Sequence, residues 1–169
     1  MTASNDPQPG QPISSIDPAP EVVAEIDRRA AALRAAPQDA GAMDAVWRAV
    51  YGLKHWLFIA RGEPQSPRPY AIAHQQGPLV LAFTTAARAR TAGMANGLSG
   101  DEAGLVLTVP LPAAADWAAS MAGSGVTGFV VDYGTLDLFA PITNLVPMRD
   151  WFATGPVTGS PGTGSAPGG

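Results

Sequence analysis

Four short runs of mostly apolar residues constrain the fold of this chain more than any other feature of its sequence. Each run is shorter than an ordinary helix and is bounded by glycine, proline or polar residues, which is typical of strands. The run at 55–60 is almost wholly apolar, which predicts a strand that is buried on both faces. The runs cover residues 55–60, 79–83, 105–109 and 126–132. The chain therefore needs a sheet at its centre.

Two further strands complete the expected set. One covers residues 70–74, and Gln75 to Pro78 forms the turn that leads from it into the run at 79–83. The other covers residues 135–139, after a tight turn at Tyr133 and Gly134. The glycine and proline content of residues 61–68 predicts a loop.

Helical patterns lie before and between these strands. Residues from Pro20 to the break at Pro37 carry an apolar face at helical spacing, and a second stripe runs from Met43 to Tyr51 with Asp39 or Asp44 near its start. Thr84 or Thr85 predicts an N-cap for a helix over about 86–96. Another helix is expected within 110–123, and a last helical turn within 141–151.

This order of elements predicts an α/β (α+β) fold. We expect a mixed β-sheet of about five to six strands, with two N-terminal helices and further helices packed on the sheet. Residues 19–153 form the single domain of this interpretation. Residues 1–18 and the Gly/Ser/Pro-rich tail 154–169 have the composition of disordered segments.

Composition narrows the classes of function. A net charge of −4 without clustered lysine and arginine makes nucleic-acid binding a poor fit. The absence of cysteine excludes disulfides, thiolate nucleophiles and cysteine-based zinc sites. No apolar run approaches the roughly 20 residues of a membrane span, and residues 1–10 show no signal sequence. A cytoplasmic protein that binds neither nucleic acid nor membrane is expected.

Motifs for catalysis, cofactors or metals are weak. Gly123, Gly125 and Gly128 match G-x-G-x-x-G, but they follow a helix and precede a strand, so a helix C-cap and a turn are the favoured interpretation. For His55 and His74 we favour hydrogen-bonded, partly buried histidines over metal ligands. Turn chemistry is likewise favoured over acid–base catalysis for two aspartates, Asp132 and Asp137. We predict no catalytic residue, no cofactor and no metal site.

Residues 78–93 (PLVLAFTTAARARTAG) resemble the N-terminal domain of the SseB-like family, known for enhanced serine sensitivity. The matching pattern is an apolar strand, then Phe83, Thr84 and Thr85, then a helix bearing Arg88. The tryptophan-containing helix and apolar strand over 46–59 are also similar to that family. The resemblance covers about residues 20–150 and implies a bacterial cytoplasmic protein, with no established catalytic residues to carry over.

A non-enzymatic interaction or regulatory module is the function that these observations favour. Its partner is an unknown protein, and the edge strand expected at 135–139 could also pair with a second copy. Candidate contact residues are Arg88, Arg90, Trp151 and Phe152. The alternative is a small-molecule binding protein or cryptic enzyme with a pocket at the sheet edge that uses His74, Arg88 or Asp132. A third possibility is an accessory protein of a secretion or phage system.

Overall fold

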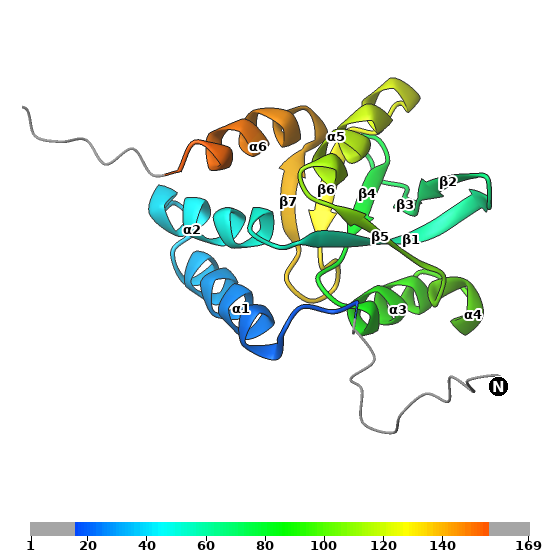
Figure 1. Ribbon diagram of the computed structural model, residues 1–169, viewed down its shortest axis with the longest axis horizontal. Helices are drawn as coiled ribbons and strands as arrows, with labels where there is room; N and C mark the ends of the chain where they lie inside the picture. Colours follow the sequence, from blue (N-terminus) through cyan, green and yellow to red (C-terminus); the bar gives the residue numbers. More distant parts are fainter. Residues whose placement is uncertain (1–15, 156–169) are drawn as a thin grey trace, which may run out of the picture.

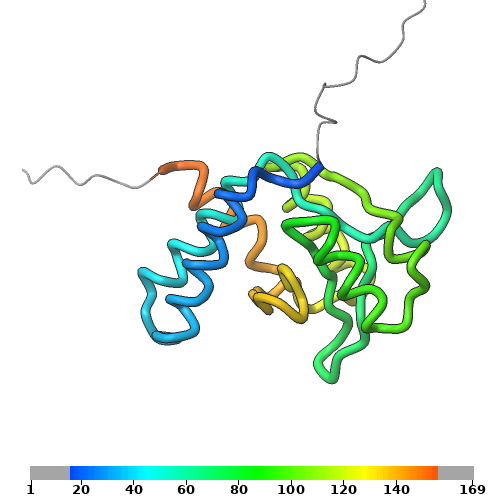
Figure 2. The backbone as a smooth tube through the Cα atoms, turned by 90° about the horizontal axis from the view of Figure 1, so that it is seen from below, coloured from blue at the N-terminus to red at the C-terminus, as the bar shows by residue number. Residues whose placement is uncertain are grey.

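A computed structural model of the chain describes residues 16–155. Its helices α1 and α2 lie at one end of the molecule and the hairpin of β1 and β2 lies at the other, as two views at right angles show (Figures 1 and 2). The disorder predicted for 1–15 and 156–169 falls outside the described residues. Residues 16–18 lie against the domain, where the Asp17 carboxylate accepts a hydrogen bond from Ala86 N at 2.8 Å.

Helices α1 (Pro20–Ala35) and α2 (Ala40–Tyr51) form the N-terminal pair. Asp39, rather than Asp44, is the N-cap of α2, because its carboxylate accepts from Gly41 N at 2.8 Å and from Ala42 N at 3.2 Å. Both helices have the positions and ends that the sequence predicts.

The first sheet has three strands in the order β2-β1-β5, namely β2 (Ser66–Pro69), β1 (His55–Glu63) and β5 (Val106–Pro110). All of its pairings are antiparallel. The prediction of a loop over 61–68 is wrong, because β1 extends to Glu63 and turns directly into β2. Proline is tolerated in β2 because this strand lies at the edge of the sheet, where a missing N–H costs no ladder bond.

The second sheet has four strands in the order β3-β4-β6-β7. They are β3 (Ala71–Ile72), β4 (Leu79–Ala82), β6 (Gly128–Val131) and β7 (Leu138–Pro141). Strands β4 and β6 are parallel, and the other pairs are antiparallel. The strand predicted at 135–139 begins three residues late, because residues 132–137 form a turn that contains two aspartates with positive φ, Asp132 and Asp137.

The two sheets join at one bridge. Leu57 N donates to Phe83 O at 3.1 Å, and Phe83 N donates to Leu57 O at 2.8 Å. Tyr70 extends the junction, since its N–H donates to Ile59 O and its carbonyl accepts from Leu81 N. The predicted α+β class is therefore confirmed, with seven strands in two linked sheets among the described residues instead of one sheet of five to six.

The remaining helices connect the strands and cover the sheets (Figure 1). They are α3 (Ala86–Ala95), α4 (Gly100–Ala103), α5 (Ala113–Ser120) and α6 (Leu145–Ala153), with short 3-10 turns at Met121–Ser124 and Ile142–Asn144. Asp101 and Glu102 lie in the short helix α4. A capping box between Ser99 and Glu102 makes this segment the helix α4.

Alternating side chains of β1 divide the core into two layers. Trp56 and Phe58 pack with residues of α1, α2 and α5 on one side, whereas Leu57 and Ile59 pack with residues of α3 on the other. All four side chains are at most 1% exposed. The apolar part of β1 is thus covered on both faces, as its run at 55–60 predicts.

Candidate functional site

A buried polar cluster lies beyond the carboxyl ends of the parallel strands β4 and β6. Thr84 follows β4 by two residues and Asp132 follows β6 directly, and both residues are fully buried. The crevice beyond the carboxyl ends of parallel strands is where ligands most often bind in α/β sheets. This cluster is therefore the first place to look for chemistry.

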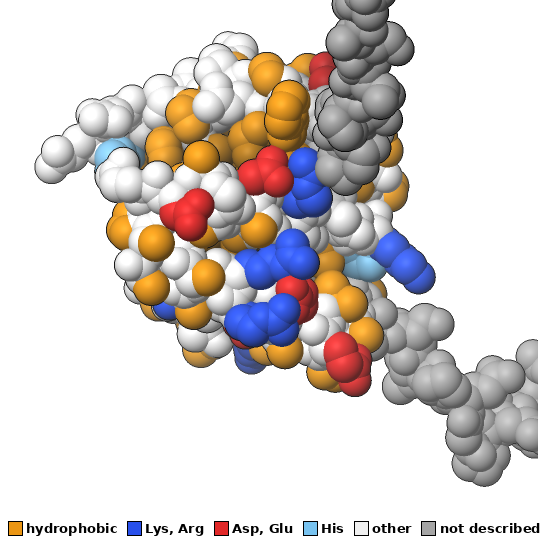
Figure 3. All heavy atoms as spheres, turned by 90° about the vertical axis from the view of Figure 1, so that its left-hand side faces the viewer, with side chains coloured by type: hydrophobic (Ala, Val, Ile, Leu, Met, Phe, Trp, Pro, Cys, Tyr) orange, Lys and Arg blue, Asp and Glu red, His pale blue; other side chains and the backbone are white. Residues whose placement is uncertain are grey.

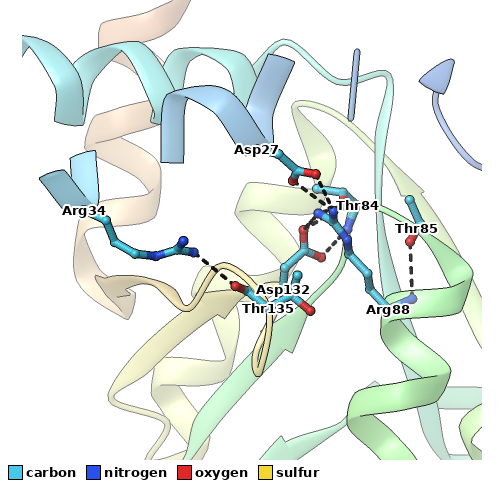
Figure 4. Close-up of polar contacts among 7 residues, drawn as sticks. All are labelled: Asp27, Arg34, Thr84, Thr85, Arg88, Asp132 and Thr135. Atoms are coloured by element: carbon cyan, nitrogen blue, oxygen red, sulfur yellow. Dashed lines mark hydrogen bonds and ion pairs between the residues drawn. The ribbon is translucent and has the colours of Figure 1, made fainter. Parts of the chain in front are cut away.

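Asp132 receives three hydrogen bonds on its carboxylate (Figure 4). Thr84 N donates to Oδ1 at 2.8 Å, and Thr84 Oγ1 donates to Oδ2 at 2.7 Å. Arg88 Nη1 donates to Oδ2 at 2.7 Å. Because a buried carboxylate is costly unless it is paired and hydrogen-bonded, these donors are what keep Asp132 in the interior.

Arg88 bridges Asp132 to helix α1. Its Nη2 lies 2.9 and 2.8 Å from the two carboxylate oxygens of Asp27, so one guanidinium is shared between two carboxylates. Burial alone would lower the pKa of Arg88, but hydrogen bonds to Asp27 and Asp132 outweigh it, and the pKa is raised above its ordinary value. Arg88 therefore stays charged and ties α1 and α3 to the end of β6.

The turn after Asp132 is held by the same residue. Asp132 has φ +53°, and its carbonyl accepts from the backbone N–H groups of Thr135, Leu136 and Asp137. Asp137 has the turn role that the sequence predicts, because its carboxylate accepts from Gly134 N at 2.7 Å. The Asp132 carboxylate points into the cluster and not into the turn (Figure 4).

The polar groups of this cluster bond to one another and so hold the surrounding elements together. Every carboxylate oxygen of Asp132 is occupied, and across residues 16–155 no buried side-chain nitrogen or oxygen lacks a partner. No group of three or more potential metal ligands occurs in the described part of the chain. A general base or a metal site has to be within reach of a substrate or an ion, whereas the Asp132 carboxylate is fully buried and held by Thr84 and Arg88.

The other predicted positions also take structural roles. Gly123 lies within the 3-10 turn after α5, Gly125 has φ +89° at its C-cap, and Gly128 opens β6, which confirms the interpretation of G-x-G-x-x-G as a cap and a turn. The partial burial expected for His74 is wrong, because this residue follows the short strand β3 in an exposed turn, where its Nδ1 accepts from Gln76 N at 3.3 Å. His55 is half-buried in β1 and contacts Ile16 O.

An apolar groove lies between α2, the edge strand β7 and α6. Two adjoining cavities of about 410 and 320 Å³ share Met43, Trp47 and Phe139 in their walls. Met148 and Phe152 of α6 complete the wall of the larger one. We call these five residues the α2/β7/α6 groove. Met43 is 42% exposed and Phe139 is 52% exposed, and Trp151 beside the groove is 61% exposed.

Strand β7 adds polar backbone groups to this groove. Ile142 N donates to Thr127 O, so alternate residues of β7 face β6 and the N–H and C=O of Phe139 face outward. Pro141, the next outward residue, has no N–H to offer. The edge can therefore accept only a short stretch of a partner strand, a common protection of exposed sheet edges.

Two of the four predicted contact residues lie at this groove. Phe152 packs its ring 5.2 Å from that of Tyr51, and Trp151 is exposed and donates from Nε1 to Asp44 at 3.0 Å. Arg90 is exposed elsewhere, on α3. Arg88 is in the buried cluster, where Asp27 and Asp132 occupy its guanidinium.

The sequence did not single out Met43, Phe139 or Met148. Met43 belongs to the apolar stripe of α2, and helical spacing alone does not separate the buried members of a stripe from those at its margin. Phe139 lies in a segment recognised as an edge strand, which is the one available signal. Which residues surround that edge depends on α6 folding back over α2.

Residues 16–155 contain no helix that is both long and apolar enough to cross a membrane. The resemblance to the SseB-like family stays a prediction. No protein-family model, no curated protein and no solved structure matches this chain.

Proposed function

We propose that this domain is a non-catalytic protein-interaction module and that the α2/β7/α6 groove is its contact surface. The observation that carries the proposal is the clustering of exposed apolar side chains. Of the seven large hydrophobic residues that are exposed in the described part of the chain, three lie in or beside this groove, namely Met43, Phe139 and Trp151. Contiguous apolar patches on a soluble domain mark contact surfaces.

The shape of the groove favours a particular kind of partner. A segment in extended conformation could pair with the outward N–H and C=O of Phe139, while its side chains contact Met43 and Trp47. Pro141 limits this pairing to a few residues, so apolar side chains supply most of the contact. The partner is therefore a protein with a short, apolar, extended segment.

The polar cluster supports a non-enzymatic role. Its groups are occupied by one another, and Asp132 is sealed from solvent. The alternative of a pocket that uses His74, Arg88 or Asp132 has less support, since none of these three residues lines the groove or the other cavities described here. The SseB-like identity and the bacterial cytoplasmic setting remain part of the proposal.

Site-specific photo-crosslinking tests the contact surface. A photoreactive amino acid at position 139 should capture one dominant protein from the native host lysate, and the same probe at Met94 should not, although Met94 is 50% exposed. Phe139→Asp and Trp151→Ser should weaken pull-down of that protein, whereas Met94→Ser should not. Equal capture from both positions would refute the proposed surface.

A second copy of the chain is one possible partner. Light scattering of the purified chain distinguishes this case, because a dimer through β7 would become a monomer on Phe139→Asp. A dimer that persists in this variant would place the interface elsewhere and would count against the groove.

A further inference from the structure

A second cavity lies near the C-terminal end of α2, and Phe152 separates it from the α2/β7/α6 groove. It has a volume of about 380 Å³, within the range of small-molecule sites. Arg48 and Tyr51 of α2 and Arg149 and Phe152 of α6 line it, together with Leu53, Leu111 and Pro112. We call this site the arginine cavity.

The charge of its wall distinguishes the arginine cavity from the others. Two arginines line it and no carboxylate does. The two cavities of the α2/β7/α6 groove and two further cavities beside residues 17–19 each have at least one aspartate in the wall. The face that α1, α2 and α6 present carries Asp and Glu side chains next to its Lys and Arg side chains (Figure 3), whereas the wall of the arginine cavity has no carboxylate. This wall therefore favours an anion.

Both arginines keep N–H groups available for a ligand. Arg48 uses Nε and Nη2 for Asp44, at 3.3 and 3.4 Å, and a guanidinium has five N–H donors in total. Arg149 uses Nη1 for Asp116 and both Nε and Nη2 for Asp150, which leaves part of its five N–H donors. These two aspartates are 51% and 65% exposed and lie outside the wall of the cavity. Ion pairs this exposed are weak and exchange readily, so an incoming oxyanion can share these guanidinium groups.

The rest of the wall favours an apolar body on the ligand. The Phe152 ring lies between the Arg48 guanidinium, 5.0 Å from the ring centroid, and the Tyr51 ring, 5.2 Å away. Tyr51 donates its hydroxyl proton to Leu145 O at 2.8 Å, and burial raises its pKa while Arg149 offsets part of the rise. Tyr51 therefore remains neutral and contributes an aromatic face. Leu53, Leu111 and Pro112 add aliphatic surface.

We propose that the arginine cavity binds a small organic carboxylate, with its carboxylate on Arg48 and Arg149 and its apolar body against Phe152, Leu111 and Pro112. This site shares Phe152 with the α2/β7/α6 groove, but both arginines lie outside the groove, so the proposal does not rest on the proposed contact surface. A guanidinium recognises a carboxylate through two parallel N–H···O bonds, which gives orientation as well as charge.

Titration with benzoate tests this site, with benzamide as the uncharged probe of the same shape. Benzoate should bind to the full chain with a dissociation constant near or below about 1 mM, with amide NMR shifts confined to residues 48–53, residue 111 and residues 149–153. The double variant Arg48→Gln/Arg149→Gln should weaken binding at least about tenfold. The control Arg28→Gln removes an arginine that is 75% exposed on α1 and should leave binding unchanged.

Three outcomes would overturn the site: no saturable binding of benzoate, equal binding of benzamide, or unchanged binding in the double variant. Circular dichroism verifies that the double variant folds, and the two single variants replace it if it does not. Phe139→Asp should leave benzoate binding unchanged, so failure of the groove and failure of the arginine cavity give different results.

Discussion

The polar cluster at Asp132 and the α2/β7/α6 groove use their side chains in opposite ways. The cluster joins α1, α3, β4 and β6 through charged and hydroxyl groups that satisfy one another, and its central carboxylate has no access to solvent. The groove has the buried Trp47 at its base and four apolar side chains that stay partly exposed, beside an edge strand with unpaired backbone groups.

This difference separates folding from binding. Removing the partner of a buried polar group destabilises the folded state, because the group that is left behind stays desolvated. An exposed apolar side chain contributes little to the free energy of folding, but covering it with a partner surface contributes to the free energy of binding. We therefore expect substitutions at the cluster to change the free energy of unfolding, and substitutions at the groove to change association.

Asp132→Ala is expected to have the largest effect. It leaves the Arg88 guanidinium without one of its two carboxylates and places alanine at a φ of +53°, which alanine tolerates poorly. Breaking a buried ion pair costs about 3–5 kcal/mol of the free energy of unfolding, which urea denaturation measures. Asp132→Asn, which tolerates this φ, should cost less. A loss below about 1 kcal/mol for Asp132→Ala would contradict the structural role of the cluster.

Gly93→Ala tests how tightly the layer beside the cluster is packed. A Cβ at Gly93 would lie 2.8 Å from Ala103 Cβ and 2.9 Å from Ile59 Cδ1, so α3 would have to move away from the sheet. Such overpacking costs about 1–3 kcal/mol in urea denaturation. The control is Gly123→Ala, where a Cβ meets nothing within 4 Å and should cost little. Equal effects at both positions would mean that α3 is loosely packed.

Phe139→Ser should separate binding from folding. Because Phe139 is 52% exposed, its loss should change the free energy of unfolding by no more than about 1 kcal/mol. Phe129→Ala, on the neighbouring strand β6 with a fully buried ring, should cost about 3–5 kcal/mol. Pull-down of the crosslinked partner should weaken for Phe139→Ser. A large loss of stability there would make Phe139 a core residue and weaken the case for the groove.

Local patterns predict some of this molecule well and other parts poorly. The helix from Ala40 to Tyr51 follows from its apolar stripe and its Asp39 cap, and the interior of β1 follows from its apolar run. Strand β2 has two prolines among its four residues, so only its pairing with β1 makes it a strand.

The polar cluster depends on contacts far apart in the chain. Arg88 is 61 residues from Asp27 and 44 residues from Asp132, and only the tertiary fold brings them together. The groove is equally non-local, since it needs α6 to pack against α2. For that reason sequence patterns place Asp132 only in a turn and Met43 only in an apolar stripe, whereas the structure places them in the buried cluster and in the groove.

Glu102→Gln should have the smallest effect and should depend on pH. The Ser99 N–H and the Arg61 guanidinium lower the pKa of Glu102 below its ordinary value of 4.5. A carboxylate with a lowered pKa stabilises the folded state above its ordinary pKa and loses that contribution as pH falls through the lowered value. The unfolding midpoint of the wild type should therefore exceed that of Glu102→Gln slightly at neutral pH, and the two should converge as the pH falls below the lowered pKa of Glu102. Because glutamine keeps the capping box with Ser99, the difference in midpoint reports the charge of Glu102 alone.

Two outcomes would contradict this prediction. A difference in midpoint that stays constant across this pH range would assign the effect to the shape of the cap and not to its charge. A loss of stability as large as that of Asp132→Ala would remove the contrast between an exposed ion pair and the buried cluster.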